Sequence, residues 1–408
     1  MTRAQALARI AAIDPAAYAR SRNALDGAVS GLSPWITHGV VSLPEVAAGV
    51  AARHPGLHLQ HRFVMELGWR EFFRHVWAHR GSGIFESLHA GPLPDGAYAA
   101  EVPADVREAR TGVPVIDQAV RQLYAQGLLH NHARLWLASY LVHLRKVHWR
   151  AGADWLLGHL LDGDLASNHL SWQWVAGTGS HQPYLFNAEN VARFAPADWH
   201  SPGSVIDTDY DTLDAMARSP QPVPARVAAP AAGAGREVQE PPRHTRPPAG
   251  LLPPAPAPGW VAGRDVWLLH PWALRPPPAD VLPDAVCLGW WPAEHHAAWP
   301  WTDSRWRWAA ARLAELTQQA VHADRATLAA LLAGARSVQA WSDPHADPHA
   351  PAAVQLRPPQ RLFDAVERPC ASFSSWWKRS TRGVKGLAEL PGWPAGVAAL
   401  SAPAAARR

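Results

Sequence analysis

A proline-rich stretch near the middle of the chain constrains its fold more than any other feature. Twelve of the 39 residues from 220 to 258 are proline, mixed with Ala, Gly and Arg. Proline lacks the amide hydrogen that helices and sheets need, and it favours extended polyproline segments. Such a composition does not bury a core. We therefore predict a linker over residues 219–258 that separates two folded parts, residues 1–218 and residues 259–383.

The first part has the pattern of a helical domain. Apolar residues recur at helical spacing in residues 61–79 and 113–147, and Thr111-Gly112-Val113-Pro114 is a typical helix start. No alternating run in residues 1–218 is long enough to predict a strand. We expect this part to be helical throughout.

The second part alternates strand-like and helix-like segments. Strands are expected at 265–270, 285–289 and 337–341, and helices at 305–321 and 325–335. This alternation favours a small, Rossmann-like parallel sheet with covered faces, although no G-x-G-x-x-G signature is present. The predicted fold class is thus mostly α, an all-helical domain followed by a small α/β domain. The Ala- and Pro-rich residues 384–408 are expected to be a flexible tail.

Composition excludes several classes of protein. With 408 residues, of which 48% are hydrophobic and 18% charged, the chain is too apolar for global disorder. Two cysteines are too few for a disulfide scaffold or an iron–sulfur cluster. No run approaches about 18 apolar residues and no signal-peptide core opens the chain, so we expect a cytoplasmic protein with no membrane partner. A net charge of +4 is compatible with a polyanionic partner, and 22 tryptophans suggest stacking or electron transfer.

Two short motifs suggest metal chemistry, but simpler interpretations are favoured. His130-Asn131-His132 spells a nuclease motif, yet it lies in a helical stretch rather than in the ββα-metal setting of that nuclease. Residues 342–349 (SDPHADPH) offer two His and two Asp side chains, but a proline-rich solvated loop is the commoner structure for such a segment. We predict no metal site.

Polar and aromatic residues are concentrated in five segments of the helical part. Glu66, Trp69 and Arg70 lie at i, i+3 and i+4 and share one helix face, which alone would suggest a surface ion pair beside a core tryptophan. The other four segments are 31–35 (GLSPW), 130–134 (HNHAR), 162–168 (DGDLASN) and 172–174 (WQW). The two aspartates around Gly163 resemble a calcium loop, but its later ligands are missing.

Together these segments resemble the FAD-binding helical domain of the DNA photolyase/cryptochrome family. The resemblance covers residues 1 to about 210. It rests on LSPWITHGVVS (32–42), ELGWREFFRH (66–75), TGVPVIDQAVRQL (111–123), HNHAR (130–134), WRAG (149–152) and DGDLASNHLSWQW (162–174). It implies a U-shaped FAD in the middle of the helical domain.

The resemblance also implies which residues hold this cofactor. The phosphate end would be lined by Tyr18, Ser30, Leu32 and Ser33. Asp162 would pair with Arg70 beside the flavin, an arrangement that is useful only if both partners stay satisfied. Asp164 would accept hydrogen bonds from the isoalloxazine edge, and the neutral amide of Asn168 would face flavin N5. Asn131 and Arg134 would complete the pocket.

Substrate and electron-transfer roles follow from the same resemblance. Glu66 would hydrogen-bond damaged bases flipped out of UV-damaged single- or double-stranded DNA, and Trp69 and Trp174 would form aromatic walls around them. Asn131 and His132 would lie near the DNA. Trp172 and Trp149 match the two inner members of the family's tryptophan electron chain. The outer tryptophan has no counterpart, and Tyr98 is the nearest candidate.

The chain departs from the family pattern in four places. The α/β antenna domain that normally precedes the helical domain is absent, and the C-terminal α/β part resembles that domain moved to the other end. His132 and Gly31 stand where arginines are common, and residues 177–187 (GTGSHQPYLFN) lack another arginine. Because phosphate contacts carry much of DNA affinity, these losses bear on repair more than on FAD.

Two functions therefore remain open from the sequence. One is a blue-light-driven carbon–carbon lyase that repairs UV pyrimidine dimers with an electron from reduced FAD. The other is a non-enzymatic flavoprotein photoreceptor that signals through its C-terminal part. Glu66, Asn168 and Trp174 favour repair, and the lost arginines favour signalling.

Overall fold

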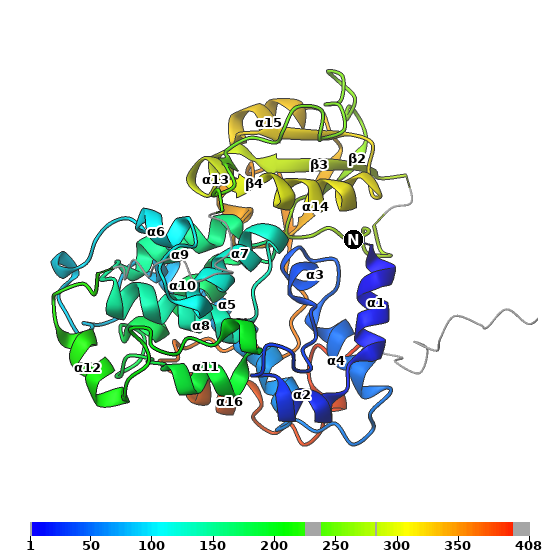
Figure 1. Ribbon diagram of the computed structural model, residues 1–408. Coiled ribbons are helices and arrows are strands. Elements are labelled where there is room, and N and C mark those ends of the chain that lie inside the picture. The colour runs from blue at the N-terminus through cyan, green and yellow to red at the C-terminus, as the bar shows by residue number, and fades with distance from the viewer. Residues whose placement is uncertain (1, 225–237, 282–283, 395–408) are drawn as a thin grey trace, which may run out of the picture.

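The structure, a computed structural model, describes residues 2–224, 238–281 and 284–394. Figure 1 shows a helical part below and an α/β part, drawn mainly in yellow, above it. The predicted combination of a helical domain with an α/β domain is confirmed at this level. None of the helices in the described ranges is both long and apolar enough to cross a membrane.

Helices form most of the first part. They are α1 (Arg3–Ala12), α2 (Pro15–Ser21), α3 (Ser33–Thr37), α4 (Leu43–Ala51), α5 (Arg62–Arg80), α6 (Ala104–Arg107), α7 (Pro114–Gln126), α8 (Asn131–Ser139), α9 (Trp149–His159), α10 (Leu165–Ala176), α11 (Ala188–Phe194) and α12 (Tyr210–Arg218), with 3₁₀ turns at Gly81–Phe85, Asp95–Ala97 and Ala197–Trp199 and a π turn at Tyr140–Leu144.

Local signals explain several of these boundaries. Ser42 and Glu45 form a reciprocal capping box at the start of α4. α7 begins with Pro114 and ends at Gly127, whose φ of 64° is the left-handed conformation that glycine tolerates best. The periodic stretch 113–147 is therefore split into α7, α8 and the π turn.

The second part is built on a parallel sheet. Its strands are β2 (Asp265–Leu269), β3 (Val286–Pro292), β5 (Ala320–Ala323), β6 (Ser337–Trp341) and β7 (Gln355–Arg357), in the order β5-β3-β2-β6-β7, and every pairing is parallel. The helices of this part are α13 (Ala293–Ala298), α14 (Asp303–Ala314), α15 (Arg325–Leu331) and α16 (Phe373–Ser380), with 3₁₀ turns at Asp347–His349 and Leu387–Glu389.

One predicted element of this part needs correction. The helix predicted over 305–321 ends at Ala314, and residues 320–323 form β5 instead. The cause is visible in the sheet, where Ala320 pairs with Gly289, and a Cβ at Gly289 would lie 2.6 Å from Leu313. A strand needs small residues at this close approach, which helical periodicity does not reveal.

The linker and tail are more ordered than expected where the structure describes them. Residues Arg243–His244 form β1, which pairs antiparallel with β4 (Trp301–Thr302). Leu387 and Leu390, in the expected tail, are buried. Residues 225–237 and 395–408 lie outside the described residues. The described residues next to these ranges pack against folded neighbours, because they supply apolar groups or backbone hydrogen bonds to them.

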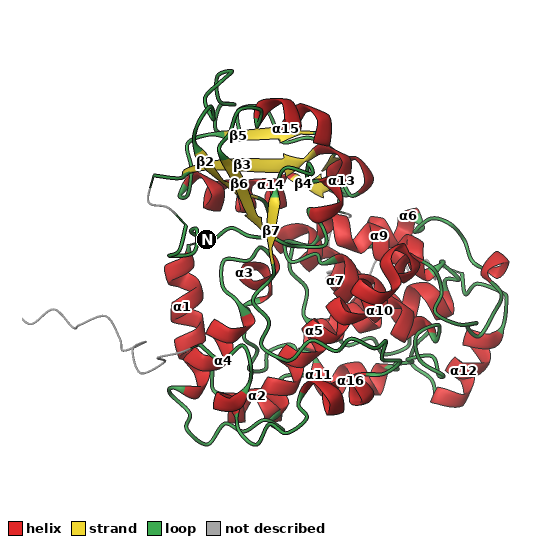
Figure 2. Cartoon of the chain, turned by 180° about the vertical axis from the view of Figure 1, so that it is seen from behind, coloured by secondary structure: helices red, strands yellow, loops and turns green. Residues whose placement is uncertain are grey.

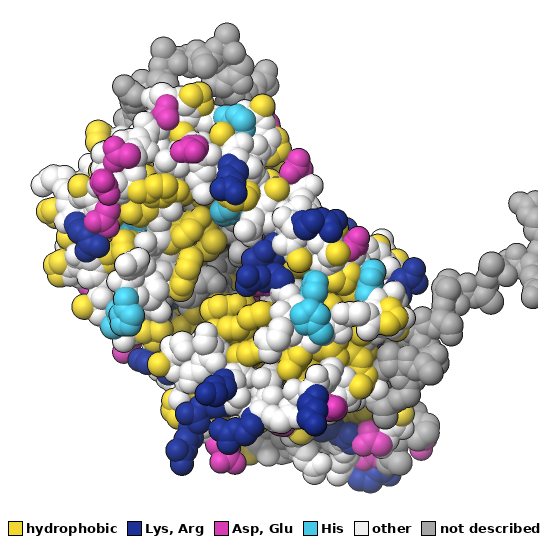
Figure 3. All heavy atoms as spheres, turned by 90° about the horizontal axis from the view of Figure 1, so that it is seen from below, with side chains coloured by type: hydrophobic (Ala, Val, Ile, Leu, Met, Phe, Trp, Pro, Cys, Tyr) yellow, Lys and Arg dark blue, Asp and Glu magenta, His cyan; other side chains and the backbone are white. Residues whose placement is uncertain are grey.

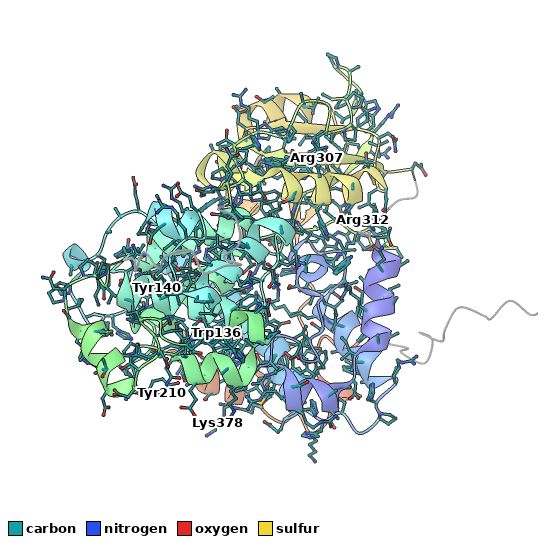
Figure 4. All side chains as sticks on the ribbon, in the orientation of Figure 1. Trp136, Tyr140, Tyr210, Arg307, Arg312 and Lys378 are labelled. Carbon is teal, nitrogen blue, oxygen red and sulfur yellow. The ribbon has the colours of Figure 1, made fainter. Side chains whose placement is uncertain are left out.

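The two larger apolar cores among the described residues account for most of the packing. The first joins residues of α1–α5 to the sheet and α16, and it includes Trp35, Val64, Trp267 and Trp376. The second lies among α6–α12 and includes Trp136. Figure 4 shows Trp136 inside the helical part, and Arg312 on the side of α14 that faces it. The first core therefore crosses from one part of the chain to the other.

The C-terminal segment returns to the helical part after the sheet, where α16 packs against α5 (Figure 2). Glu71 of α5 accepts hydrogen bonds from the amides of Leu362, at 2.5 Å, and Phe363, at 3.2 Å. A Cβ at Gly68 would lie 2.5 Å from the ring of Trp377, so α16 approaches α5 closely. The central helix α5 is thus held from outside by the last elements of the chain.

Candidate functional site

A partly open cavity of about 210 Å³ lies where α3, α5, α8, α9 and α10 meet. Its wall contains most of the residues expected to bind the cofactor and the substrate. These are Ser33, Glu66, Trp69, Arg70, Asn131, Arg134, Asp162, Asp164, Asn168 and Trp172. Residues from five separate segments of the sequence therefore converge on one space.

The first ion pair of the cavity joins Asp162 to Arg134. Arg134 Nη2 lies 2.8 Å from Asp162 Oδ2 and 3.0 Å from Oδ1. The predicted pairing of Asp162 with Arg70 is wrong, because Arg70 donates to Thr37 Oγ1 at 2.7 Å and pairs with Asp164 at 3.9 Å. Burial alone would raise the pKa of Asp162, but Arg134, Ser33 and Arg70 together outweigh burial, and this pKa lies below its ordinary value.

The second ion pair joins Asp164 to Arg74. Asp164 Oδ1 accepts the amide of Ser167 at 2.8 Å and so caps α10, while Oδ2 lies 2.5 Å from Arg74 Nη2. Burial raises the pKa of this carboxyl, yet the charges of Arg74 and then Arg70 outweigh it and hold the pKa well below its ordinary value. Asp164 is therefore ionised, and it is fixed by both a helix cap and a salt bridge.

Glu66 and Trp69 form the partly open side of the cavity. Glu66 lies 3.4 Å from Arg22 Nε, and burial raises the pKa of this carboxyl although Arg22 opposes the shift. Trp69 stacks on Phe373 of α16, with ring centroids 4.2 Å apart and planes 9° from parallel. This aromatic wall is thus two rings thick, and its outer ring comes from the C-terminal segment.

Asn168 is held in a fixed orientation. Its side-chain nitrogen donates to Ala153 O at 2.8 Å, and the side chain is almost fully buried in the cavity wall. A neutral amide at this place offers a hydrogen bond without an acidic proton.

One glycine and one histidine lie between the residues predicted to transfer electrons, which are Trp172, Trp149 and Tyr98. Trp172 packs on Gly152, where a Cβ would lie 2.3 Å from its ring, and Gly152 is one helical turn from Trp149. The ring of His148 lies 5.7 Å from Trp149 and 6.2 Å from Tyr98. Among the described residues, Tyr98 is thus connected to Trp149 through one intervening ring.

Three residues predicted for the phosphate end lie outside the cavity wall. Tyr18 packs edge-on against Phe63 at 5.4 Å. Ser30 Oγ accepts the amide of Leu32 at 3.4 Å, and Leu32 is fully buried just before α3. Ser33 is the member of this group that reaches the cavity.

Two residues predicted to contact DNA also lie outside the wall. His132 is engaged by the protein itself, with Nδ1 2.8 Å from Asn23 O and Nε2 3.2 Å from the hydroxyl of Tyr184. Trp174 is 42% exposed and lies 5.4 Å from the ring of Tyr184. Figure 3 shows Lys and Arg side chains gathered at several places on one face of the molecule, some beside a hollow.

Sequence reasoning missed several residues that support the cavity. Arg74 could have been found, because it lies at i+4 from Arg70 on the same helix face. Arg305 of α14 could not have been found in this way, because it comes from the other part of the chain. It reaches the loop between α9 and α10, where it donates to Gly163 O at 2.6 Å. A Cβ at Gly163 would lie 2.8 Å from the backbone oxygen of Leu157 and 2.6 Å from Arg305 Nη1, which explains why glycine separates the two aspartates.

Among the described residues, no group of three or more His, Cys, Asp or Glu side chains is arranged to hold a metal ion. His130 is instead the N-cap of α8, and its Nδ1 accepts the amide of His132. The SDPHADPH segment departs from the predicted solvated loop, because His345 is buried with a side-chain exposure of 2%.

Comparisons with known proteins show what the sequence of this chain is similar to. Residues 63–201 match the family model described as the FAD binding domain of DNA photolyase. The deoxyribodipyrimidine photo-lyase of Streptomyces griseus is 40% identical over 153 residues, covering 38% of this chain and 33% of that protein. The enzymes of that name from Thermus thermophilus and a Synechococcus strain are 37% identical over 180 residues and 33% identical over 184 residues. This chain covers 41% and 37% of their lengths.

Solved structures with partial similarity include two proteins of related names. An archaeal photolyase from Sulfolobus tokodaii, solved with two FAD molecules, has 25% identity and a TM-score of 0.42, covering 53% of this chain and 50% of that chain. A cryptochrome from Synechocystis has 23% identity and a TM-score of 0.44, covering 55% and 53%.

Proposed function

We propose that this protein, whose helical region belongs to the DNA photolyase/cryptochrome family, binds FAD in the cavity and uses blue light to split pyrimidine dimers in DNA. The observation that supports this most strongly is the convergence of Glu66, Asp162, Asp164, Asn168 and Trp172 on one cavity. The chain spans only 33–41% of the length of the curated relatives cited above. Activity, substrate and DNA partner are therefore proposed for this chain.

The groups around the cavity fit a flavin. The wall offers ionised acceptors, arginine donors and an oriented amide, which together match a heterocycle with hydrogen-bonding edges. The enclosed volume of about 210 Å³ is smaller than the roughly 300–1,000 Å³ of sites that enclose a drug-sized ligand. A dinucleotide would therefore extend beyond it toward the partly exposed Ser33.

The protein side of the mechanism follows from the described contacts. When bound, reduced FAD would supply light absorption and an electron that the lesion borrows and returns after its bond has split. Asp164 and Asn168 would orient the ring system, because both are already held by Arg74, Ser167 and Ala153. This preorganisation avoids the cost of ordering polar groups at the moment of binding.

On the substrate side, Glu66 and Trp69 would receive the flipped bases. Trp69 would present a π-face backed by Phe373, and the carboxyl of Glu66 would hydrogen-bond the base pair as it gains negative charge. The raised pKa of Glu66 favours the protonated form that can donate such a bond.

Electrons would reach the flavin through Trp172 and Trp149, with Tyr98 as the outer station. The placement of His148 between the rings of Trp149 and Tyr98 supports this assignment. Tyr98 is half-buried, so it is partly accessible to an external reductant.

A photoreceptor remains the second candidate function. It is favoured by a contact between the α/β part and the cavity residue Asp164. Arg74 pairs with Asp164 on one side and with Asp343 of the α/β part on the other. A change of charge on a flavin could be transmitted to the α/β part through this pair. The inward engagement of His132 also removes one expected DNA contact.

We further propose that the α/β part is the displaced counterpart of the family's antenna domain. A cavity of about 520 Å³ lies between the two parts, lined by Trp272 after β2 and by Trp341 and Asp343 at the end of β6. Strand order reverses between β2 and β6, and open parallel sheets bind ligands at the carboxyl ends of strands at such a switch point.

A light-dependent repair assay on dimer-containing oligonucleotides tests the proposed function. Purified protein should release FAD on denaturation and repair the oligonucleotide under blue light after photoreduction. Glu66→Ala should reduce repair per bound lesion by about 10- to 100-fold, because a charge-assisted hydrogen bond of about 1.5–3 kcal/mol is lost.

The control is Glu86→Ala, which removes an exposed carboxylate outside the cavity wall. Flavin content should be equal in the two variants and the parent. FAD binding without any discrimination between damaged and intact DNA would reject repair and favour the photoreceptor.

A further inference from the structure

The segment 342–349, which follows β6, does not behave as a solvated loop. Asp343 and His345 turn inward and reach the helical part, where their side chains are 15% and 2% exposed. Both lie next to the cavity residue Asp164 and its partner Arg74. Their positions raise the question of what two polar residues of the α/β part do beside a site built by the helical part.

Arg74 connects Asp343 to the cavity. Its Nη2 lies 2.5 Å from Asp164 Oδ2, and its Nη1 lies 3.1 Å from Asp343 Oδ2. The guanidinium thus spans two carboxylates, one on each side of the interface. Without Asp343, only one of these two ion pairs would hold Arg74 in the plane that Asp164 requires.

His345 contacts both Asp343 and the backbone next to Asp164. Its Nδ1 lies 2.6 Å from Asp343 Oδ1 and donates to it, since a carboxylate only accepts. The partners therefore assign the tautomer, and Nε2 accepts the amide of Leu165 at 3.2 Å. Leu165 is the first residue of α10, directly after Asp164. Burial lowers the pKa of His345, which keeps Nε2 free to accept.

We infer that Asp343 and His345 are positioning residues for Asp164, so that the cavity carboxylate is set in place from the α/β part. Asp343 fixes the arginine that pairs with Asp164, and His345 fixes the backbone that follows it. This inference rests on the proposed function for its flavin readout, but the geometry of the loop from 162 to 165 can be tested without FAD.

Three variants test the inference. Asp343→Asn keeps the shape of the side chain and removes its charge, and His345→Phe keeps a ring and removes both nitrogens. Asp347→Asn is the control, because this carboxylate binds Ser342 and the amide of Asp343 within the same loop. All three are compared with the parent by thermal unfolding, to separate local effects from loss of the fold.

Two readouts are expected to change in the first two variants. In the holoprotein, Asp343→Asn should weaken FAD binding about tenfold and shift the flavin absorption bands and reduction potential. In the apoprotein, His345→Phe should speed hydrogen–deuterium exchange in peptides that cover residues 160–172, because the Leu165 amide loses its acceptor. Asp347→Asn should match the parent in both.

The inference is overturned if Asp343→Asn and His345→Phe match the parent in both readouts, or if Asp347→Asn changes them equally. A parent protein that binds no FAD would refute the proposed function alone. The exchange comparison on the apoprotein would then still decide whether these residues position the loop.

Discussion

At the scale of single residues, the cavity depends on how each buried carboxylate is paired. Asp162 and Asp164 lie two residues apart, yet α8 neutralises the first through Arg134 and α5 neutralises the second through Arg74. Arg70 assists Asp164 from a greater distance and is anchored on Thr37. Removing one member of a buried pair costs more than the pair contributes, because the remaining charge is left without a partner.

Arg134→Met should therefore destabilise the protein more than Arg70→Met does. The first change leaves Asp162 without its arginine partner. We expect a loss of about 3–5 kcal/mol in the free energy of unfolding, together with lower flavin occupancy. The second change leaves Asp164 paired with Arg74. Urea unfolding and flavin content per protein check both variants, and an equal or larger effect of Arg70→Met would contradict this order.

At the scale of secondary-structure elements, close helix contacts at glycine position the aromatic rings. α9 and α10 approach at Gly152, on which the ring of Trp172 rests, and α5 and α16 approach at Gly68, on which Trp377 rests. Because packing at these contacts is already dense, a side chain added there must displace a ring or a helix.

Gly152→Ala should displace Trp172 from the cavity wall. The new Cβ would lie 2.3 Å from the ring, and overpacking of this kind costs about 1–3 kcal/mol. Thermal unfolding and FAD affinity measure the effect. Gly56→Ala is the matched control, since nothing lies within 4 Å of a Cβ there. Indistinguishable stabilities of the two variants would show that the α9–α10 contact is looser than described.

Docking of the C-terminal segment on α5 should depend on pH through Glu71. Burial raises the pKa of Glu71 to about 7, against its ordinary value of 4.5, although the amides of Leu362 and Phe363 oppose the rise. Between these two pKa values the folded protein binds more protons than the unfolded chain. The free energy of unfolding therefore falls as pH rises through this window, by at most about 1.4 kcal/mol per pH unit.

Urea unfolding at pH 5 and pH 8 measures this dependence. Glu71→Gln should flatten it relative to the parent, whereas Glu86→Gln, which alters an exposed carboxylate, should leave it unchanged. Parallel pH profiles for the parent and Glu71→Gln would exclude Glu71 as the source.

At the scale of the whole molecule, one core crosses the boundary between the two parts. Trp35 and His38 of the first part pack against Trp308 of α14, and Arg305 reaches the cavity loop from the same helix. Several histidines are buried in this region. Neither ring nitrogen of His296 has a hydrogen-bond partner among the described residues.

His296→Phe should make the molecule more resistant to acid. Burial holds the pKa of His296 well below its ordinary value of 6.5, so the unfolded chain binds the proton first and stability is lost as pH falls below about 6.5. The advantage of the variant over the parent should therefore grow as pH is lowered from 7 to 5. Thermal unfolding across this range, with the exposed His58→Phe as control, checks it, and a constant difference would contradict the buried neutral state.

The sequence alone determined the helical part and most of the cavity. Helical periodicity and caps are local, so α5 and α7 follow from nearby residues, and the ordered segments from Glu66 to Trp172 carried the family resemblance. It also indicated β2, β3 and β6, because buried parallel strands are short apolar runs.

Only the tertiary structure decided which groups pair. Whether Asp162 meets Arg70 or Arg134 depends on the angle between α5 and α8, which no local pattern encodes. Arg305, Asp343 and His345 come from the other part of the chain, more than 140 residues from their partners. Such contacts depend on how two separately patterned parts pack, and packing is set by the summed fit of many side chains rather than by any one segment.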